Sequence, residues 1–159
     1  MVRRKEKTVY WGAFILEWFG YLQDHDLSSS DYRILFFLCQ NMKSYDNSIY
    51  MRQKQISEEL NMDKGNVSKC IKKLCEKQFI VKIPNGFMVN PHLFYVGKGH
   101  PGSREELRDN FDSFLRKNKL SPRFYLNELE RKLELDPNEI YGEDEDNDED
   151  DFDFTSLLS

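Results

Sequence analysis

Residues 51–90 carry the pattern of two short helices joined by a tight turn and followed at once by a β-hairpin. In the first helix, Ile56 and Leu60 stand one turn apart and share a side. A turn at 61–62 follows. Asp63 then occupies the N-cap position, where its carboxylate can accept the free N–H groups of the next helix. This order restricts the region to a helix-turn-helix.

The second predicted helix, residues 64–77, has one apolar side and one polar side. Val67, Ile71 and Leu74 recur at helical spacing and form the apolar side. The other sides carry lysine, asparagine and serine, which can contact phosphates and base edges. A solvated surface helix has the same pattern, so this helix alone leaves both interpretations open.

The hairpin favours the DNA-binding interpretation. Residues 79–83 are strand formers, and residues 87–89 predict the return strand. Asn85 and Gly86 stand between them, and Asn-Gly is the strongest short hairpin signal because both residues tolerate positive φ. Residues 49–51 predict a short strand that pairs with the hairpin. The sequence therefore predicts a winged helix-turn-helix that binds double-stranded DNA.

The N-terminal part supplies three further segments. Residues 1–8 form a basic arm, which either follows a DNA groove or is a solvated terminus. Large apolar residues recur through 9–23 and predict a helix, which packs in the core or forms a dimer interface. Residues 31–42 predict the first helix of the winged domain. We expect this domain to span residues 9–98.

A glycine-rich stretch at 97–102 predicts a domain boundary. After it, Ser103 and Glu106 form a capping box that begins a helix. Pro122 is placed to begin another, because proline is favoured at the first helical position. The resulting helical extension, 103–135, is too small for a core of its own. We expect it to pack on the winged domain or to form a homodimer, and dimerisation is the leading hypothesis.

The net charge of −5 hides a charge division within the chain. Residues 136–159 contain eleven acidic residues and no lysine or arginine, whereas residues 1–135 contain 23 basic and 17 acidic residues, a net charge of +6. The body of the chain is therefore compatible with DNA.

The acidic tail, residues 136–159, is predicted to be disordered because it has few apolar groups to bury. Its end places four apolar residues among acids and hydroxyls: Phe152, Phe154, Leu157 and Leu158. Three hypotheses stay open for this tail. It docks on a partner, it competes with DNA on the chain's own basic surface, or it only aids solubility.

Several classes of function are not expected. The chain has no signal-peptide pattern and no apolar run that could span a membrane, which predicts a cytoplasmic protein. Cys39, Cys70 and Cys75 form no CxxC pattern, so neither a disulfide framework nor a metal site is predicted. We expect no cofactor. No cluster of nucleophile, base and orienting residue is visible, so an enzyme is not predicted.

Parts of the chain resemble a known family. The run KGNVSKCIKKLCEKQFI, the turn PNGF and the segment VNPHLFYVGK are similar to winged-helix replication initiators of Gram-positive plasmids, the RepL-type family. The most specific part is Asn90, Pro91, Phe94 and Gly97, whereas MarR-like repressors share the helix-turn-helix. The resemblance implies binding to an origin on a plasmid or other mobile element and recruitment of host replication proteins. The acidic tail departs from the family pattern.

The predicted DNA contacts form two groups. Four residues are predicted to reach base edges in the major groove: Lys64, Asn66, Ser68 and Lys69. Six are predicted to contact the backbone and position the duplex: Gln53, Lys54, Lys72, Lys73, Lys82 and Asn85. The same contacts would serve a transcriptional or copy-control regulator. A protein-interaction adaptor that acts through the acidic tail is the alternative from a different class.

Overall fold

The structure is a computed structural model that describes residues 12–14, 16, 19–23, 26–43, 45–96, 101–130 and 132–135. The basic arm, the acidic tail and most of the predicted glycine-rich boundary lie outside these residues. The chain divides into two compact units, Met1–Ser121 and Pro122–Ser159. The first unit therefore extends beyond the boundary that the sequence predicts at 97–102.

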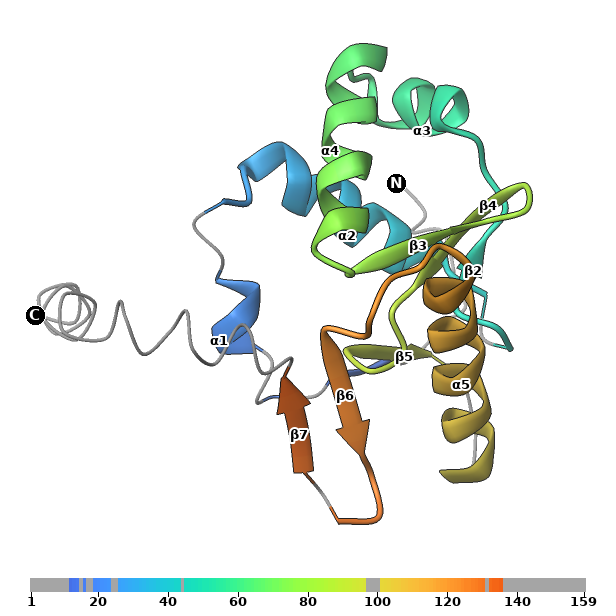
Figure 1. Ribbon diagram of the computed structural model, residues 1–159. Helices are drawn as coiled ribbons and strands as arrows, with labels where there is room; N and C mark the ends of the chain where they lie inside the picture. The colour runs from blue at the N-terminus through green and yellow to red at the C-terminus, as the bar shows by residue number, and fades with distance from the viewer. Residues whose placement is uncertain are drawn as a thin grey trace, which may run out of the picture. The chain divides into compact units, whose positions relative to one another are not determined.

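The first unit contains five helices and five strands among its described residues (Figure 1). In chain order they are β1 (Gly12–Phe14), α1 (Phe19–Leu22), α2 (Ser29–Asn41), β2 (Ser48–Ile49), α3 (Gln53–Leu60), α4 (Lys64–Glu76), β3 (Ile80–Ile83), β4 (Gly86–Val89), β5 (Phe94–Val96) and α5 (Pro101–Lys117). Strands β2, β4 and β3 form an antiparallel sheet in that order. The predicted mostly helical fold with a small β-hairpin is confirmed. Among the described residues, no helix is long and apolar enough to cross a membrane.

Helices α2 and α4 begin at residues with side chains that cap them. The hydroxyl of Ser28 accepts the Asp31 N–H at 3.2 Å, and the Asp31 carboxylate accepts the Ser28 N–H at 2.8 Å. This reciprocal pair is a capping box. At α4, the predicted cap is confirmed, because the Asp63 carboxylate accepts the Asn66 N–H at 3.1 Å. Both helix starts are therefore fixed by local sequence.

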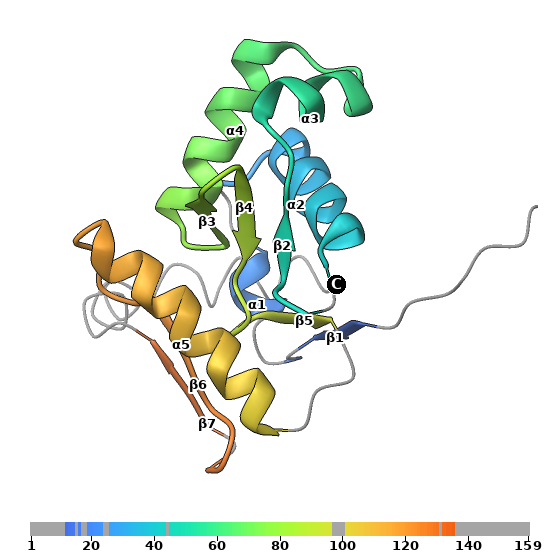
Figure 2. The ribbon, with the colours of Figure 1, turned by 90° about the vertical axis from the view of Figure 1, so that its right-hand side faces the viewer.

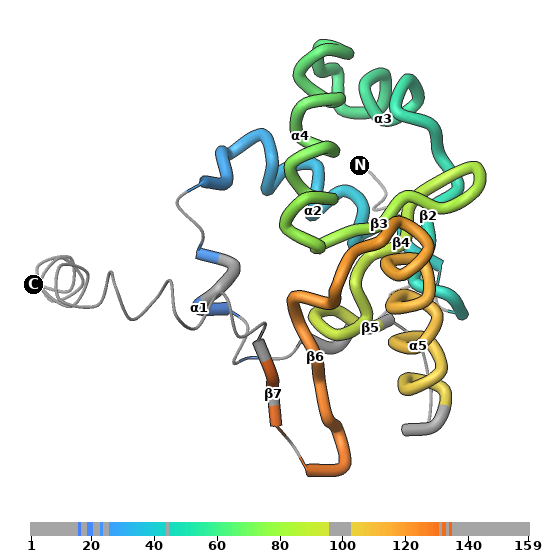
Figure 3. Tube along the Cα trace, in the orientation of Figure 1, coloured from blue at the N-terminus to red at the C-terminus, as the bar shows by residue number. Residues whose placement is uncertain are grey.

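Helices α3, α4 and α5 end in the same motif, in which a residue with positive φ reverses the chain. These residues are Asn61, Gln78 and Lys119, with φ of 50°, 60° and 58°. In each case its N–H donates to the carbonyl three residues back, and the next N–H donates to the carbonyl five residues back. This is the Schellman motif, which satisfies carbonyls at a helix end. At Asn61 it forms the tight turn between α3 and α4 (Figure 3).

The β3–β4 hairpin is buried on both faces. Val81, Ile83 and Met88 on one face pack against α5 through Leu107, Phe111 and Leu115 (Figure 2). Because side chains alternate along a strand, Ile80, Phe87 and Val89 lie on the opposite face, and they too are buried. The apolar side of α5 therefore packs within the chain, which is one of the two arrangements that the sequence predicts for it.

The segment after β4 is a buried polar corner, residues 90–94. The Asn90 side chain donates to the carbonyl of Gln78 at 2.8 Å and accepts the N–H of His92 at 2.9 Å. The His92 ring then meets the Asp112 carboxylate of α5 at 3.0 Å. Since all three side chains are buried, the corner joins the end of α4, the hairpin and α5.

The predicted helix over 9–23 is wrong at residues 12–14. Residues 12–14 instead form β1, which pairs antiparallel with β5 from Gly12↔Val96 to Phe14↔Phe94. Among the described residues of this segment, Phe19–Leu22 is α-helical, as α1. Large apolar residues suit a strand as well as a helix, and here the edge of β5, distant in sequence, provides a pairing partner.

The predicted helix after Pro122 is also wrong. The second unit contains β6 (Phe124–Asn127) and β7 (Lys132–Leu135), which pair antiparallel. Aromatic residues favour strands, and the Asn127 side chain accepts the N–H of Glu130 at 3.3 Å in the turn. The predicted helical extension therefore consists of one helix, α5, and one hairpin.

The turn of the β3–β4 hairpin lies one residue earlier than predicted. Ile83 pairs with Gly86, so Pro84 and Asn85 form the two-residue loop, and Asn85 has a φ of 66°. Proline followed by a residue with positive φ is the pattern of a type II turn. Gly86 is needed for a different reason, because a Cβ there would overlap the carbonyl oxygen of Ile49 in β2.

We predict that Gly86→Ala lowers the free energy of unfolding by about 1–3 kcal/mol, because β2 must move away from β4 to admit the methyl group. Urea titration followed by circular dichroism measures the change. Gly20→Ala is the matched control, since a Cβ at Gly20 has no atom within 4 Å. Equal effects of the two substitutions would show that the close approach of β2 does not constrain the hairpin.

Candidate nucleic-acid interface

Helix α4 is anchored by the apolar side that the sequence predicts. Val67, Ile71 and Leu74 are buried, and α4 packs against both α2 and α3. The four residues predicted to reach base edges are exposed on α4: Lys64, Asn66, Ser68 and Lys69. Lys72 is exposed as well. Helix α4 therefore presents donors and positive charges to solvent on more than one side, with Lys64, Ser68 and Lys72 along one of them.

The remaining predicted contacts lie on α3 and on the hairpin. Lys54 on α3 is exposed, whereas Gln53 is half-buried. Asn85 is exposed at the hairpin turn, and Lys82 is exposed on β3. Burial raises the pKa of the Cys75 thiol on α4 to about 11, against an opposing effect of the nearby Lys82 ammonium. Because Cys75 belongs to α4, the effect of the Lys82 charge on its thiol places Lys82 on the side of the hairpin toward α4.

Lys72 keeps its charge accessible. Its ammonium lies 4.0 Å from the Glu76 carboxylate one turn on, and both side chains are well exposed. An exposed pair of this kind contributes little to stability and exchanges readily for another partner. A phosphate can therefore replace Glu76 beside Lys72.

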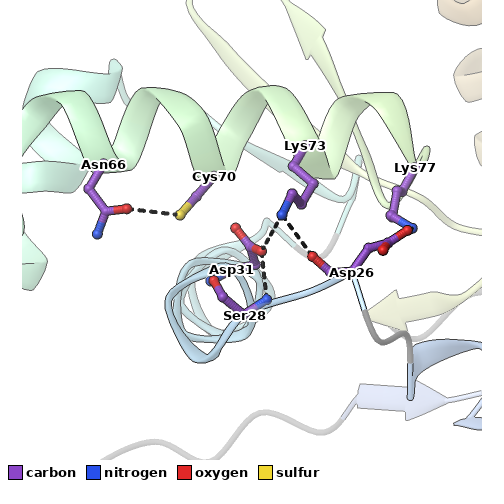
Figure 4. A network of polar contacts seen from close by, with 7 residues as sticks. All are labelled: Asp26, Ser28, Asp31, Asn66, Cys70, Lys73 and Lys77. Carbon is purple, nitrogen blue, oxygen red and sulfur yellow. Dashed lines mark hydrogen bonds and ion pairs between the residues drawn. The ribbon is translucent and has the colours of Figure 1, made fainter.

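Lys73, predicted to contact phosphate, also contacts groups within the chain, with 42% of its side chain exposed. Its ammonium donates to the carbonyl of Asp26 at 2.7 Å and lies 3.6 Å from the Asp31 carboxylate (Figure 4). One turn further on, the Lys77 ammonium meets the Asp26 carboxylate at 3.0 Å. This side of α4 faces the start of α2, so Lys73 is a positioning residue that ties the two helices together.

The charge on Asp31 is stabilised by its neighbours. Burial raises its pKa, but hydrogen bonds from Ser28 and from the Cys70 thiol, with the charge of Lys73, outweigh burial and lower the pKa from its usual 3.8. Burial and the adjacent Asp31 carboxylate raise the pKa of Cys70 to about 11. The Cys70 thiol is therefore protonated at neutral pH. Its single S–H donates either to the Asp31 carboxylate or to the Asn66 side-chain oxygen, 3.7 Å from the sulfur (Figure 4).

The other two cysteines are also unreactive in character. Burial raises the pKa of Cys39 to about 12, and Cys75 is raised as described above. All three cysteines are free thiols. Across the described part of the chain, no group of three or more His, Cys, Asp or Glu residues could hold a metal ion.

The comparisons with known proteins identify the family. A family model described as Firmicute plasmid replication protein (RepL) matches residues 13–150. The chain belongs to the RepL family. The resemblance seen in the α4 region and in the 90–97 segment is thus confirmed. The RepL model also matches residues 136–150, contrary to the expectation that the acidic tail departs from the family pattern. No curated protein and no solved structure matches the chain.

The sequence analysis did not identify the contacts of Asp26 and Asp31 with α4. The pattern that predicts a helix over residues 31–42 gives no sign that the Asp31 carboxylate receives a lysine from α4. The spacing of Lys73 and Lys77, four residues apart, places both on one side of α4. Which side meets a neighbouring helix depends on the packing angle, which the sequence of α4 does not contain.

We predict that Asp31→Asn lowers the free energy of unfolding by about 1–3 kcal/mol at neutral pH, because the charged hydrogen bonds from Ser28 and Cys70 and the ion pair with Lys73 are lost. A carboxylate with a lowered pKa stabilises the fold above its unfolded pKa, and this stabilisation is lost as pH falls through the folded value. The difference from the unsubstituted chain should therefore shrink as pH falls below 3.8.

Urea titrations at a series of pH values measure this difference. Asp109→Asn on α5 is the matched control, because its carboxylate is exposed and should change stability little at any pH. A difference for Asp31→Asn that stays constant down to the lowest pH would contradict the assignment of a charge-dependent contact.

Proposed function

We propose that this RepL protein binds double-stranded DNA sequence-specifically through α3, α4 and the β3–β4 hairpin, acting as a winged helix, and that it initiates replication of a plasmid or mobile element. The observation that carries the proposal is the exposed set of lysine, asparagine and serine on α4, backed by a buried apolar side. A paired hairpin follows α4 directly.

The dimensions of α4 suit the major groove. An α-helix with its side chains is about 10–12 Å across, and the major groove is about 12 Å wide. The N-terminal half of α4 carries Lys64, Asn66 and Ser68, all exposed. Side chains at this end of a recognition helix reach base edges in helix-turn-helix proteins. We assign base contacts to this half of α4 and phosphate contacts to Lys72.

Asn66 is the strongest candidate for base discrimination. Its backbone N–H is already used by the Asp63 cap, and its side-chain oxygen receives only the long contact from the Cys70 thiol. The amide nitrogen and a second lone pair on the oxygen stay available. Together they match the N6 and N7 pattern of adenine, a pairing that contributes about 1–3 kcal/mol of discrimination.

The hairpin and α3 would place the duplex against α4. Lys82 and Asn85 on the hairpin, with Lys54 on α3, are exposed and suit backbone or minor-groove contacts beside the major-groove site. We assign no covalent step to the chain itself. Host proteins recruited to the bound origin would perform DNA synthesis, and the acidic tail is a candidate for that recruitment.

Footprinting across a range of salt concentrations tests the function. A replication initiator should protect DNA within its own gene or a neighbouring origin, with affinity that falls steeply as salt rises. Protection of a promoter instead would support a transcriptional or copy-control regulator. The absence of any salt-dependent footprint would contradict DNA binding and favour a protein-interaction adaptor.

We predict that Asn66→Ala and Lys72→Ala have different effects on DNA binding. Asn66→Ala should cost about 1–3 kcal/mol on the specific site and relax the preference at one base pair. Lys72→Ala should weaken specific and random DNA alike and reduce the slope of log affinity against log salt by about one. Fluorescence anisotropy with both kinds of duplex measures the effects.

Lys43→Ala serves as the control for this pair, because Lys43 is an exposed lysine beyond the end of α2 and outside the proposed interface. Its removal should leave affinity and salt slope nearly unchanged. If the Asn66 and Lys72 variants behaved identically on specific and random DNA, the division of α4 into base and phosphate contacts would be wrong.

A further inference from the structure

Helix α5 has a strongly uneven charge distribution. Residues 104–112 contain two arginines and four acidic residues, whereas residues 113–127 contain four lysines or arginines and no acidic residue. Three of these basic residues lie in the first unit, at the end of α5 and in its terminal turn: Arg116, Lys117 and Lys119. We name this group the α5 basic end.

The α5 basic end is open to solvent. All three side chains are exposed. The Lys117 ammonium stacks over the Phe114 ring at 5.1 Å, which leaves its charge without a counterion there. Within the described part of the chain, neither Arg116 nor Lys119 forms an ion pair. A concentration of uncompensated positive charge is the electrostatic pattern of a phosphate-binding surface.

The position of this group relative to α4 is fixed by two sets of contacts. Leu107, Phe111 and Leu115 hold α5 on the hairpin that follows α4. The side-chain nitrogen of Gln78, two residues beyond α4, donates to the carbonyl of Ser121 at 2.8 Å, just after the basic end. Figure 2 shows that α5 ends on the side of the unit where α4 lies and begins away from it.

We propose that the α5 basic end binds phosphates of the DNA backbone beside the site contacted by α4, so that the duplex is held by a surface outside the helix-turn-helix and the hairpin. The proposal rests on the DNA binding proposed above. The acidic half of α5 would stay away from the duplex, and the basic end would extend the line of positive charge that Lys69 and Lys72 begin on α4.

The α5 basic end has an alternative explanation that does not involve DNA. Cations near the C-terminus of a helix stabilise that helix. The backbone at Lys119 argues against that reason as a full account. Lys119 has a φ of 58°, a conformation in which glycine is less strained than lysine. A residue selected only to end the helix would be expected to be glycine or asparagine.

The strained backbone at Lys119 allows a test in which stability and DNA binding change in opposite directions. Lys119→Gly should leave the melting temperature unchanged or raise it, because the strain is relieved. The same substitution should weaken binding to a long duplex and reduce the salt slope by about 0.9, the effect of one lost phosphate contact. Arg116→Gln combined with Lys119→Gln should reduce the slope by about 1.8.

The matched control for the double variant is Lys43→Gln combined with Lys132→Gln, which removes the same charge from exposed positions elsewhere. Binding is measured by anisotropy with a duplex that extends one helical turn beyond the footprint and with one trimmed to the bases that α4 contacts. The loss should appear only with the longer duplex.

The outcomes separate this inference from the proposed function. If Lys72→Ala weakens binding while the α5 variants match their control, the α5 basic end does not contact DNA. If Lys119→Gly lowers the melting temperature and leaves the salt slope unchanged, the lysine serves the helix end, and the inference is overturned. If neither Lys72→Ala nor the α5 variants alter binding, the DNA-binding function itself fails.

Discussion

The burial of the β3–β4 hairpin on both faces is the constraint on which the rest of the first unit depends. A two-stranded hairpin is marginal in water, and here it gains β2 as a third strand and α5 as a second layer. The close pairing of β2 requires Gly86, and the packing of α5 requires Val81 and Ile83 to face away from α4. The hairpin thereby becomes the element that positions α4 and α5 relative to each other.

Buried polar contacts fix how the hairpin, α5 and the segment after α4 pack together. Apolar surfaces tolerate small shifts, whereas a buried donor or acceptor that loses its partner is costly. The Asn90 and His92 side chains meet Gln78 and Asp112, which belong to the segment after α4 and to α5. The residues that carry the family resemblance at this point are buried and hold the segment after α4, the hairpin and α5 together.

Features determined by residues close in sequence could be predicted. The Asp63 cap, the turn at Asn61 and the apolar side of α4 follow from local rules, and all three are present. Features that depend on a distant partner could not be predicted. Segment 12–14 is a strand because β5 pairs with it, and Lys73 lies toward the start of α2 because Asp26 and Asp31 receive its ammonium. The β6–β7 hairpin was missed because its leucines also fit a helix, and strand pairing prevailed.

The contacts of Lys73 and Lys77 bear on the charge that the region of α4 presents to solvent. Lys73 on α4 and Lys77 just after it contact acidic residues at the start of α2, whereas Lys64, Lys69 and Lys72 lie on the open side. Affinity for DNA at physiological salt depends on the number of phosphates neutralised, and the proposed function assigns phosphate on α4 to Lys72. The proposed DNA binding would therefore draw further phosphate contacts from outside α4. The hairpin offers the exposed Lys82, and the α5 basic end offers three more exposed basic side chains. A charge count on α4 thus leads to the same surface as the packing of α5.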